Sequence, residues 1–261
     1  MRFARLLLSF VLVLSFLIPS AAQTTSPRAV QYLQRALAAL SASTPVTDVT
    51  LTGTANYIAG SDDETGTATL KAILGASRID LNLSSGPRSE IQNTSAASPA
   101  GTWSGPDGVF HPMSYHNLLT DPAWFFPAFP IAHGLSSGYV ATYVGLETRD
   151  GQAVEHLTIS QISAVQSPTD APTIAHLSQM DFFLDPTTFL PAVVTFNIHP
   201  DNDAGLDIPI EVRFSNYRTV NGVQVPFHVQ KFLNNGLVLD LQFATAVLNT
   251  GLPASLFQVG G

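Results

Sequence analysis

The sequence contains no cysteine. Disulfide bonds, thiol catalysis and thiolate metal sites are therefore excluded, and so is the acylated cysteine of a bacterial lipoprotein. A chain without disulfides needs a hydrophobic core to fold, and the 261 residues are enough to form one. The composition therefore predicts a domain that folds without covalent cross-links.

Charged residues are also scarce, at 11% of the chain, whereas about 25% is typical of globular proteins. Asp and Glu number 19, and Lys and Arg together number 11. This balance argues against nucleic acid as a partner and against a purely electrostatic attachment to anionic membranes, because both depend on clustered Lys and Arg. The surface is predicted to be mainly apolar and small-polar.

Recognisable catalytic and metal-binding motifs are lacking as well. There is no Gly-x-Ser-x-Gly elbow, and the seven histidines form no His-x-His or His-Glu-x-x-His pattern. Asp201, Asp203 and Asp207 do not complete a calcium loop, so a solvated loop is favoured there. The sequence predicts no catalytic residue, no metal site and no cofactor. A carboxylate pair formed only on folding leaves a hydrolase as a less favoured alternative.

The first 22 residues have the pattern of a secretory signal peptide. Arg2 and Arg5 precede an apolar run over 6–18, and small residues follow it up to Ala22. The run is shorter than the roughly 20 apolar residues of a membrane-spanning helix, although an uncleaved anchor remains the alternative. We expect cleavage near Ala22 and a periplasmic or secreted mature chain. That chain would form a single domain over 23–261, with no transmembrane segment.

The mature chain is predicted to begin with one amphipathic helix. Ser26 is typical of an N-cap, and Pro27 is typical of a first helical position. The helix is expected to end near Ser41, with one apolar face formed by Val30, Leu33, Leu37 and Leu40. Such a face needs a second layer to cover it.

The rest of the chain predicts that this layer is a sheet. Apolar and polar residues alternate over 49–57, 67–74 and 78–83, as in half-buried strands, whereas the small polar stretch 93–106 is predicted to be a loop. Asp-Gly and Asn-Gly pairs predict hairpins at 150–151, 221–222 and 235–236. These short connections favour one curled antiparallel sheet, with the helix and irregular segments on its concave side.

The hairpin turns also predict which residues lie opposite each other. A two-residue turn at 150–151 places Val144 opposite Leu157. A turn at 235–236 places Lys231 opposite Asp240 on one face of the sheet, and Phe232 opposite Leu239 on the other face.

The densest aromatic cluster lies between prolines, in the stretch NLLTDPAWFFPAFPIAHG from Asn117 to Gly134. Proline at 122, 127 and 130 disfavours a long regular element there. The cluster is either an irregular part of the core or a hydrophobic lid over a cavity, since ligand pockets are mostly apolar and often covered by loops. We predict the lid, with the ligand-binding residues Leu118, Leu119, Trp124, Phe125, Phe126 and Phe129.

Two motifs near the C-terminus resemble those of a known family. They are Tyr-x-x-x-Asn-Gly-x-x-x-Pro, formed by Tyr217, Asn221, Gly222 and Pro226, and Asn-x-x-apolar-Pro-x-x-x-Phe, formed by Asn249, Leu252, Pro253 and Phe257. In these motifs, and in the turn 184–191, the chain resembles the periplasmic outer-membrane lipoprotein carriers, the LolA/LolB-like superfamily. The resemblance implies a strongly bent antiparallel sheet, an unclosed half-barrel around an apolar cavity.

The resemblance also implies that the protein carries or senses lipids or acylated proteins. We therefore predict a mainly β, exported and non-catalytic binding protein with a cavity for a lipid, an acyl chain or a lipoprotein. Its partner would be a lipid or an acylated protein, with another envelope protein as the alternative. The alternative is a structural or protein-interaction module whose own side chains fill the concave face.

Overall fold

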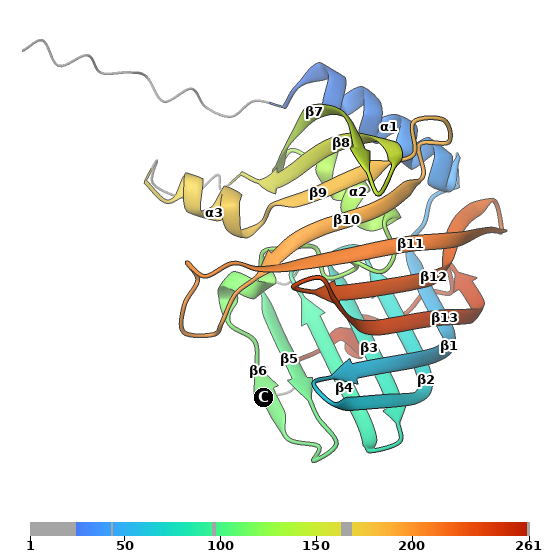
Figure 1. The fold of residues 1–261 in the computed structure, drawn as a ribbon, viewed down its shortest axis with the longest axis vertical. Helices are drawn as coiled ribbons and strands as arrows, with labels where there is room; N and C mark the ends of the chain where they lie inside the picture. Colours follow the sequence, from blue (N-terminus) through green and yellow to red (C-terminus); the bar gives the residue numbers. More distant parts are fainter. Residues whose placement is uncertain (1–24, 43, 96–97, 163–168, 260–261) are drawn as a thin grey trace, which may run out of the picture.

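The computed structural model describes residues 25–42, 44–95, 98–162 and 169–259. The predicted signal peptide and its cleavage site at Ala22 lie outside these residues. Within them the chain forms a 13-stranded antiparallel sheet, in the order β6-β5-β4-β3-β2-β1-β13-β12-β11-β10-β9-β8-β7 (Figure 1). The edge strands β6 and β7 do not pair with each other, so the sheet is unclosed. This confirms the predicted half-barrel.

The elements have the following bounds. The helices are α1 (Pro27–Ser41), α2 (Ala128–Gly134) and α3 (Ala171–Leu177), with short 3-10 turns η1 (Tyr115–Leu118) and η2 (Ala254–Phe257). The strands are β1 (Asp48–Ala59), β2 (Asp62–Ile73), β3 (Ala76–Leu83), β4 (Gly86–Asn93), β5 (Ala100–Ser104), β6 (Phe110–Pro112), β7 (Tyr139–Arg149), β8 (Gln152–Gln161), β9 (Met180–Leu184), β10 (Pro191–Ile198), β11 (Ile208–Val220), β12 (Val223–Leu233) and β13 (Gly236–Leu248).

The sheet has two halves that meet where the first and last strands pair. We call β1–β6 the N-terminal arm and β7–β13 the C-terminal arm, and β1 pairs antiparallel with β13 between them. Figure 1 shows β1 continuing the sheet next to β13, from where the N-terminal arm curves away toward β6. No helix in the part of the chain described is both long and apolar enough to cross a membrane.

Helix α1 forms where the sequence predicted it. The Ser26 hydroxyl accepts a hydrogen bond from the Ala29 backbone N–H at 3.0 Å, and Pro27 occupies the first turn. Leu33 and Leu40 of the predicted apolar face are buried. Ala29 and Ala36 complete that face, so the helix packs closely against the concave side of the sheet.

The predicted hairpins form, but two of the predicted registers are wrong. In β7–β8 a bulge between Tyr143 and Gly145 puts Tyr143, and not Val144, opposite Leu157. In β12–β13 the turn uses Asn234 and Asn235, both with positive φ, as a two-residue type I′ turn requires.

A second bulge in β12–β13 then changes the partner of Lys231. Lys231 lies opposite Leu239, and Asp240 lies opposite Gln230. Phe232 pairs with Leu237, so the predicted pair with Leu239 is also wrong. Lys231 and Asp240 therefore lie on opposite faces of the sheet. Asp240 accepts hydrogen bonds from Gln230 and His228 on the convex face, whereas Lys231 lies on the concave side.

The predicted loop over 93–106 contains a strand. Strand β5 pairs with β4, with Trp103 opposite Glu90. Its small residues give no apolar alternation. At Gly101 close packing excludes a larger side chain, because a Cβ there would lie 2.6 Å from Leu118 Cδ2. The strand carries Trp103 to the concave side of the N-terminal arm.

The motif residues near the C-terminus connect distant segments of the fold. The Asn249 side chain accepts a hydrogen bond from the Thr47 backbone N–H at 2.8 Å and donates one to the Pro45 carbonyl at 2.8 Å. Phe257 is fully buried. Tyr217 donates a hydrogen bond to the Pro191 carbonyl at 2.8 Å. These residues hold the chain end and the β9–β10 turn against the sheet, which is a structural role.

Candidate functional site

An apolar cavity of about 440 Å³ lies between the two arms of the sheet and opens to solvent. Its volume lies within the range of about 300–1,000 Å³ that is usual for small-molecule sites. The N-terminal arm contributes Tyr57, Ile79, Leu81 and Trp103, and the C-terminal arm contributes Ile198, Ile210, Leu233, Val238 and Leu239. An apolar molecule bound there would contact both halves of the sheet at once.

A second cavity, of about 180 Å³, lies next to the first and is more polar. The two cavities share five lining residues, Glu90, Trp103, Trp124, Ile198 and Lys231. The smaller cavity adds polar side chains that include Gln92, Asn117 and Thr120. Both tryptophans of the chain line both cavities, so intrinsic fluorescence reports directly on whether they are occupied.

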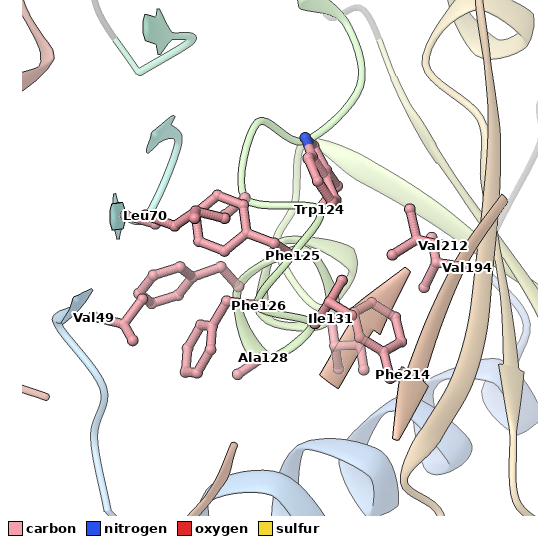
Figure 2. Packing of buried hydrophobic residues seen from close by; sticks show 14 of the residues in the cluster. Val49, Leu70, Trp124, Phe125, Phe126, Ala128, Ile131, Val194, Val212 and Phe214 are labelled. Atoms are coloured by element: carbon pink, nitrogen blue, oxygen red, sulfur yellow. The ribbon is translucent and has the colours of Figure 1, made fainter. Parts of the chain in front are cut away.

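The predicted ligand-binding residues are divided between the cavity and the core. Trp124 is the one that lines the cavities. All six side chains are buried, each no more than 5% exposed: Leu118, Leu119, Trp124, Phe125, Phe126 and Phe129. Figure 2 shows Phe125 and Phe126 pointing toward Leu70 and Val49, on the side of the N-terminal arm. The segment thus fills part of the concave side and presents Trp124 to the remaining space.

The conformation of this segment follows from its prolines and from Asp121. Asp121 Oδ1 accepts a hydrogen bond from the Ala123 N–H at 2.8 Å, and Oδ2 is paired with His133 Nδ1. Helix α2 begins directly after Pro127, with Pro130 in its first turn, where a missing N–H costs nothing. Trp124, Phe125 and Phe126 therefore lie on a turn that Asp121 holds at its start, and Phe129 lies in α2.

Lys231 is the functional candidate that the sequence did not reveal. Its ammonium nitrogen lies 4.5 Å from the centroid of the Trp124 ring, a cation–π contact. Burial lowers the pKa of Lys231, and the negative charge of Glu90 opposes that shift. The predicted register gave Lys231 a counter-charge, Asp240, on the same face of the sheet, and no sequence signal marked the bulge that separates the two residues.

The other cation on the cavity wall, Arg88, already has a partner. Arg88 Nη2 donates to Glu64 Oε1 at 3.0 Å, and its guanidinium lies 4.7 Å from the Tyr57 ring centroid. Hydrogen bonds from Ser85, supported by Arg88, lower the pKa of Glu64 to about 2. For Lys231, in contrast, the described residues provide no hydrogen bond or ion pair within 4.0 Å.

A third cavity, of about 340 Å³, has charged walls that include Arg149, His176, Asp181 and Glu211. These groups are engaged with protein partners. Arg149 pairs with Glu211, His176 Nε2 lies 2.9 Å from Asp207 Oδ1, and Asp181 Oδ1 lies 2.8 Å from His156 Nε2. No cluster of three or more His, Asp or Glu within the described ranges has the arrangement of a metal site.

Comparison with solved structures identifies the fold. A lipoprotein-sorting protein domain from Vibrio parahaemolyticus, described as putative, is 14% identical, with a TM-score of 0.55 over 88% of this chain and 96% of that one. A LolA superfamily protein from Nitrosomonas europaea is 13% identical, with a TM-score of 0.54 over 88% and 97%. A DUF1329 family protein from Desulfovibrio piger is 9% identical, with a TM-score of 0.57 over 90% and 98%.

By sequence, no family model and no curated protein matches the chain. The structural likeness extends over nearly the whole length of the three proteins compared. It confirms the fold that the C-terminal motifs predicted. At such low sequence identities the likeness is evidence about the fold and not about the function.

Proposed function

Starting from the LolA-like fold of this chain, we propose that the protein is an exported, non-catalytic carrier that binds an acyl chain of a lipid or of a lipidated protein. The observation that carries the proposal is the cavity of about 440 Å³ between the arms, with apolar walls from both. Two of the compared structures support it, since one is described as a lipoprotein-sorting protein and the other as a LolA superfamily protein.

The proposed ligand contacts include Trp124 on the aromatic segment and the apolar residues of the two arms. Phe125, Phe126 and Phe129 would hold Trp124 in place from the core side, together with Leu118 and Leu119. Binding free energy would come mainly from burial of the chain, at about 0.8 kcal/mol for each methylene removed from water. A carrier of this kind needs no catalytic group.

The second candidate is a module whose own side chains fill the concave face. It is favoured by the burial of Phe125 and Phe126, which occupy the inside of the half-barrel without any ligand. The two candidates differ in one measurable respect, because only the carrier binds an apolar molecule in the remaining cavity.

The first test is binding of the uncharged fluorescent probe N-phenylnaphthylamine to the purified mature chain. We expect saturable binding, and we expect Leu233→Trp to weaken it about tenfold, because Leu233 lines the cavity and is only half-buried. The control is Leu237→Trp. Leu237 lies opposite Phe232 on the convex face of the same hairpin, and its replacement is expected to change the affinity less than about twofold.

Equal loss of probe binding in both variants would place the probe outside the cavity. Absence of saturable binding by the unmodified chain, with no lipid extracted from protein purified from its native compartment, would contradict the carrier and favour the self-filled module.

A further inference from the structure

One cationic side chain on the cavity wall has no counter-charge in contact with it. Lys231 lies where the larger, apolar cavity meets the smaller, polar one, and it lines both. Its ammonium group lies over the Trp124 ring, and no carboxylate of the described residues lies within 4.0 Å of it. Lys231 is half-buried. An ammonium group that loses part of its hydration without gaining a partner is costly, and an anion that pairs with it offsets that cost.

Among the charged groups around Lys231, Glu90 acts on it through its negative charge without contacting it, and the others are engaged elsewhere. In the larger cavity Arg88 is paired with Glu64, and Glu90 accepts a hydrogen bond from Gln92 Nε2 at 2.9 Å. In the smaller cavity the carboxylates are those of Glu90, Asp121 and Asp201. Asp121 is paired with His133, and Asp201 Oδ1 accepts from the Ser114 hydroxyl at 2.8 Å.

This arrangement fixes where a bound anion is favoured. The acidic side chains surround the smaller cavity, whereas Arg88, Glu90 and Lys231 are the charged groups on the wall of the larger one. A negative head group is therefore favoured at Lys231 on the side of the larger cavity, with its hydrocarbon chain along the apolar walls. The Trp124 ring beside Lys231 keeps the contact partly dry, which strengthens a charge-assisted hydrogen bond.

The volume of the larger cavity limits how many hydrocarbon chains of a ligand can bind in it. At about 440 Å³ it lies in the lower part of the usual range for ligand sites. One hydrocarbon chain suits such a volume better than the several chains of a phospholipid.

On the premise of the proposed function, we propose that the preferred ligand is a single-chain amphiphile with an anionic head group, a fatty-acid carboxylate in the simplest case, which pairs with Lys231. The carboxylate would accept hydrogen bonds from the Lys231 ammonium group, while the tail lies between Ile79 and Leu81 on one arm and Ile210 and Leu239 on the other.

The test compares ligands that share one chain length and differ only in the head group. Palmitate, hexadecanol and hexadecylamine are used to displace N-phenylnaphthylamine from the mature chain, below the concentrations at which they form micelles. We expect palmitate to bind at least about tenfold more tightly than hexadecanol, as is typical of a charge-assisted contact. Hexadecylamine is expected to bind most weakly, because it places a second cation beside Lys231.

The variant Lys231→Met should remove the preference for palmitate and leave hexadecanol binding within about twofold of the unmodified chain. Lys71→Met is the matched control. Lys71 is the one other lysine in the chain, and it lies on β2 between the buried Leu70 and Ala72, on the opposite face. Its replacement should leave the preference for palmitate intact. Thermal unfolding of both variants checks that each one is folded.

Equal affinity of the unmodified chain for palmitate and hexadecanol would overturn the inference and leave the carrier standing. Tighter binding of hexadecylamine would overturn it as well, by showing that Glu90, Asp121 and Asp201 determine the preference. The ligand comparison on the unmodified chain decides the matter even if Lys231→Met does not fold. Failure of the fluorescent probe to bind at all would instead refute the proposed function.

Discussion

Replacing Phe126 with alanine is expected to lower the free energy of unfolding by about 3–5 kcal/mol, the usual range for a buried phenylalanine. Phe126 is fully buried, and its ring packs edge-on against Phe129 with centroids 5.1 Å apart. Figure 2 shows it pointing toward Val49 on β1. The substitution would leave a void between the aromatic segment and the N-terminal arm, because a short segment fixed by Asp121 cannot close over it. Chemical unfolding followed by circular dichroism measures the loss.

Phe110→Ala is the matched control for this experiment. Phe110 is 62% exposed on the edge strand β6, so the same substitution there should change the free energy of unfolding by no more than about 0.5 kcal/mol. If both variants were equally stable, the aromatic segment would not be part of the core. A large difference between them would show that the segment supports the fold, whatever Trp124 does at the cavity.

The parts of the fold predicted from the sequence are those that depend on neighbouring residues. The N-cap at Ser26, the proline after it and the apolar spacing fix α1 locally. The Asp150-Gly151 and Asn221-Gly222 turns likewise fix their hairpins, since these residues adopt the positive φ values that two-residue turns need. The half-barrel itself was predicted through a family resemblance, carried by residues such as Asn249 and Phe257 that hold the end of the chain.

The cavity was harder to predict, because it depends on how strands distant in the sequence face each other. The turn forms at Asn234-Asn235 and not at Asn235-Gly236, and together with the bulge beyond it this leaves Lys231 opposite Leu239 and not opposite Asp240. Nothing in the local sequence distinguishes the two registers. Trp103 was missed for a related reason, since its strand, β5, consists of small residues that resemble a loop.

For the aromatic segment 117–134, the sequence predicted the apolar cluster correctly but did not predict the direction of each ring. Its composition correctly marked it as the densest apolar cluster on the concave side. The direction of each ring, however, is set by the pairing of Asp121 with His133 and by the turns at Pro127 and Pro130, which orient Trp124 to the cavity and Phe125 and Phe126 to the core. The prediction that all six apolar residues bind ligand now depends on binding experiments.

Replacing Gly53 with alanine should be among the most damaging small changes in the chain. Gly53 lies at a register shift in the pairing of β1 with β13, where the two arms meet. A Cβ there would lie 2.1 Å from the Gln242 carbonyl oxygen and 2.6 Å from Phe243 Cα. Both are backbone atoms, so no side-chain rotation relieves the overlap and the strands must separate. We expect a loss of at least about 3 kcal/mol in the free energy of unfolding, at the upper end for overpacking.

The control for Gly53→Ala is Gly138→Ala, at an exposed turn where a Cβ meets nothing within 4 Å. That change should alter the free energy of unfolding by no more than about 0.5 kcal/mol, because it adds the same methyl group at a position where no other atom is in the way.

The probe assay extends the argument to the cavity, because separating β1 from β13 moves Tyr57 on one wall away from Leu239 on the other. We therefore expect weaker probe binding by any Gly53→Ala protein that still folds. Unchanged stability and binding would show that the β1–β13 junction is loose enough to accept a side chain, and that it does not set the width of the cavity.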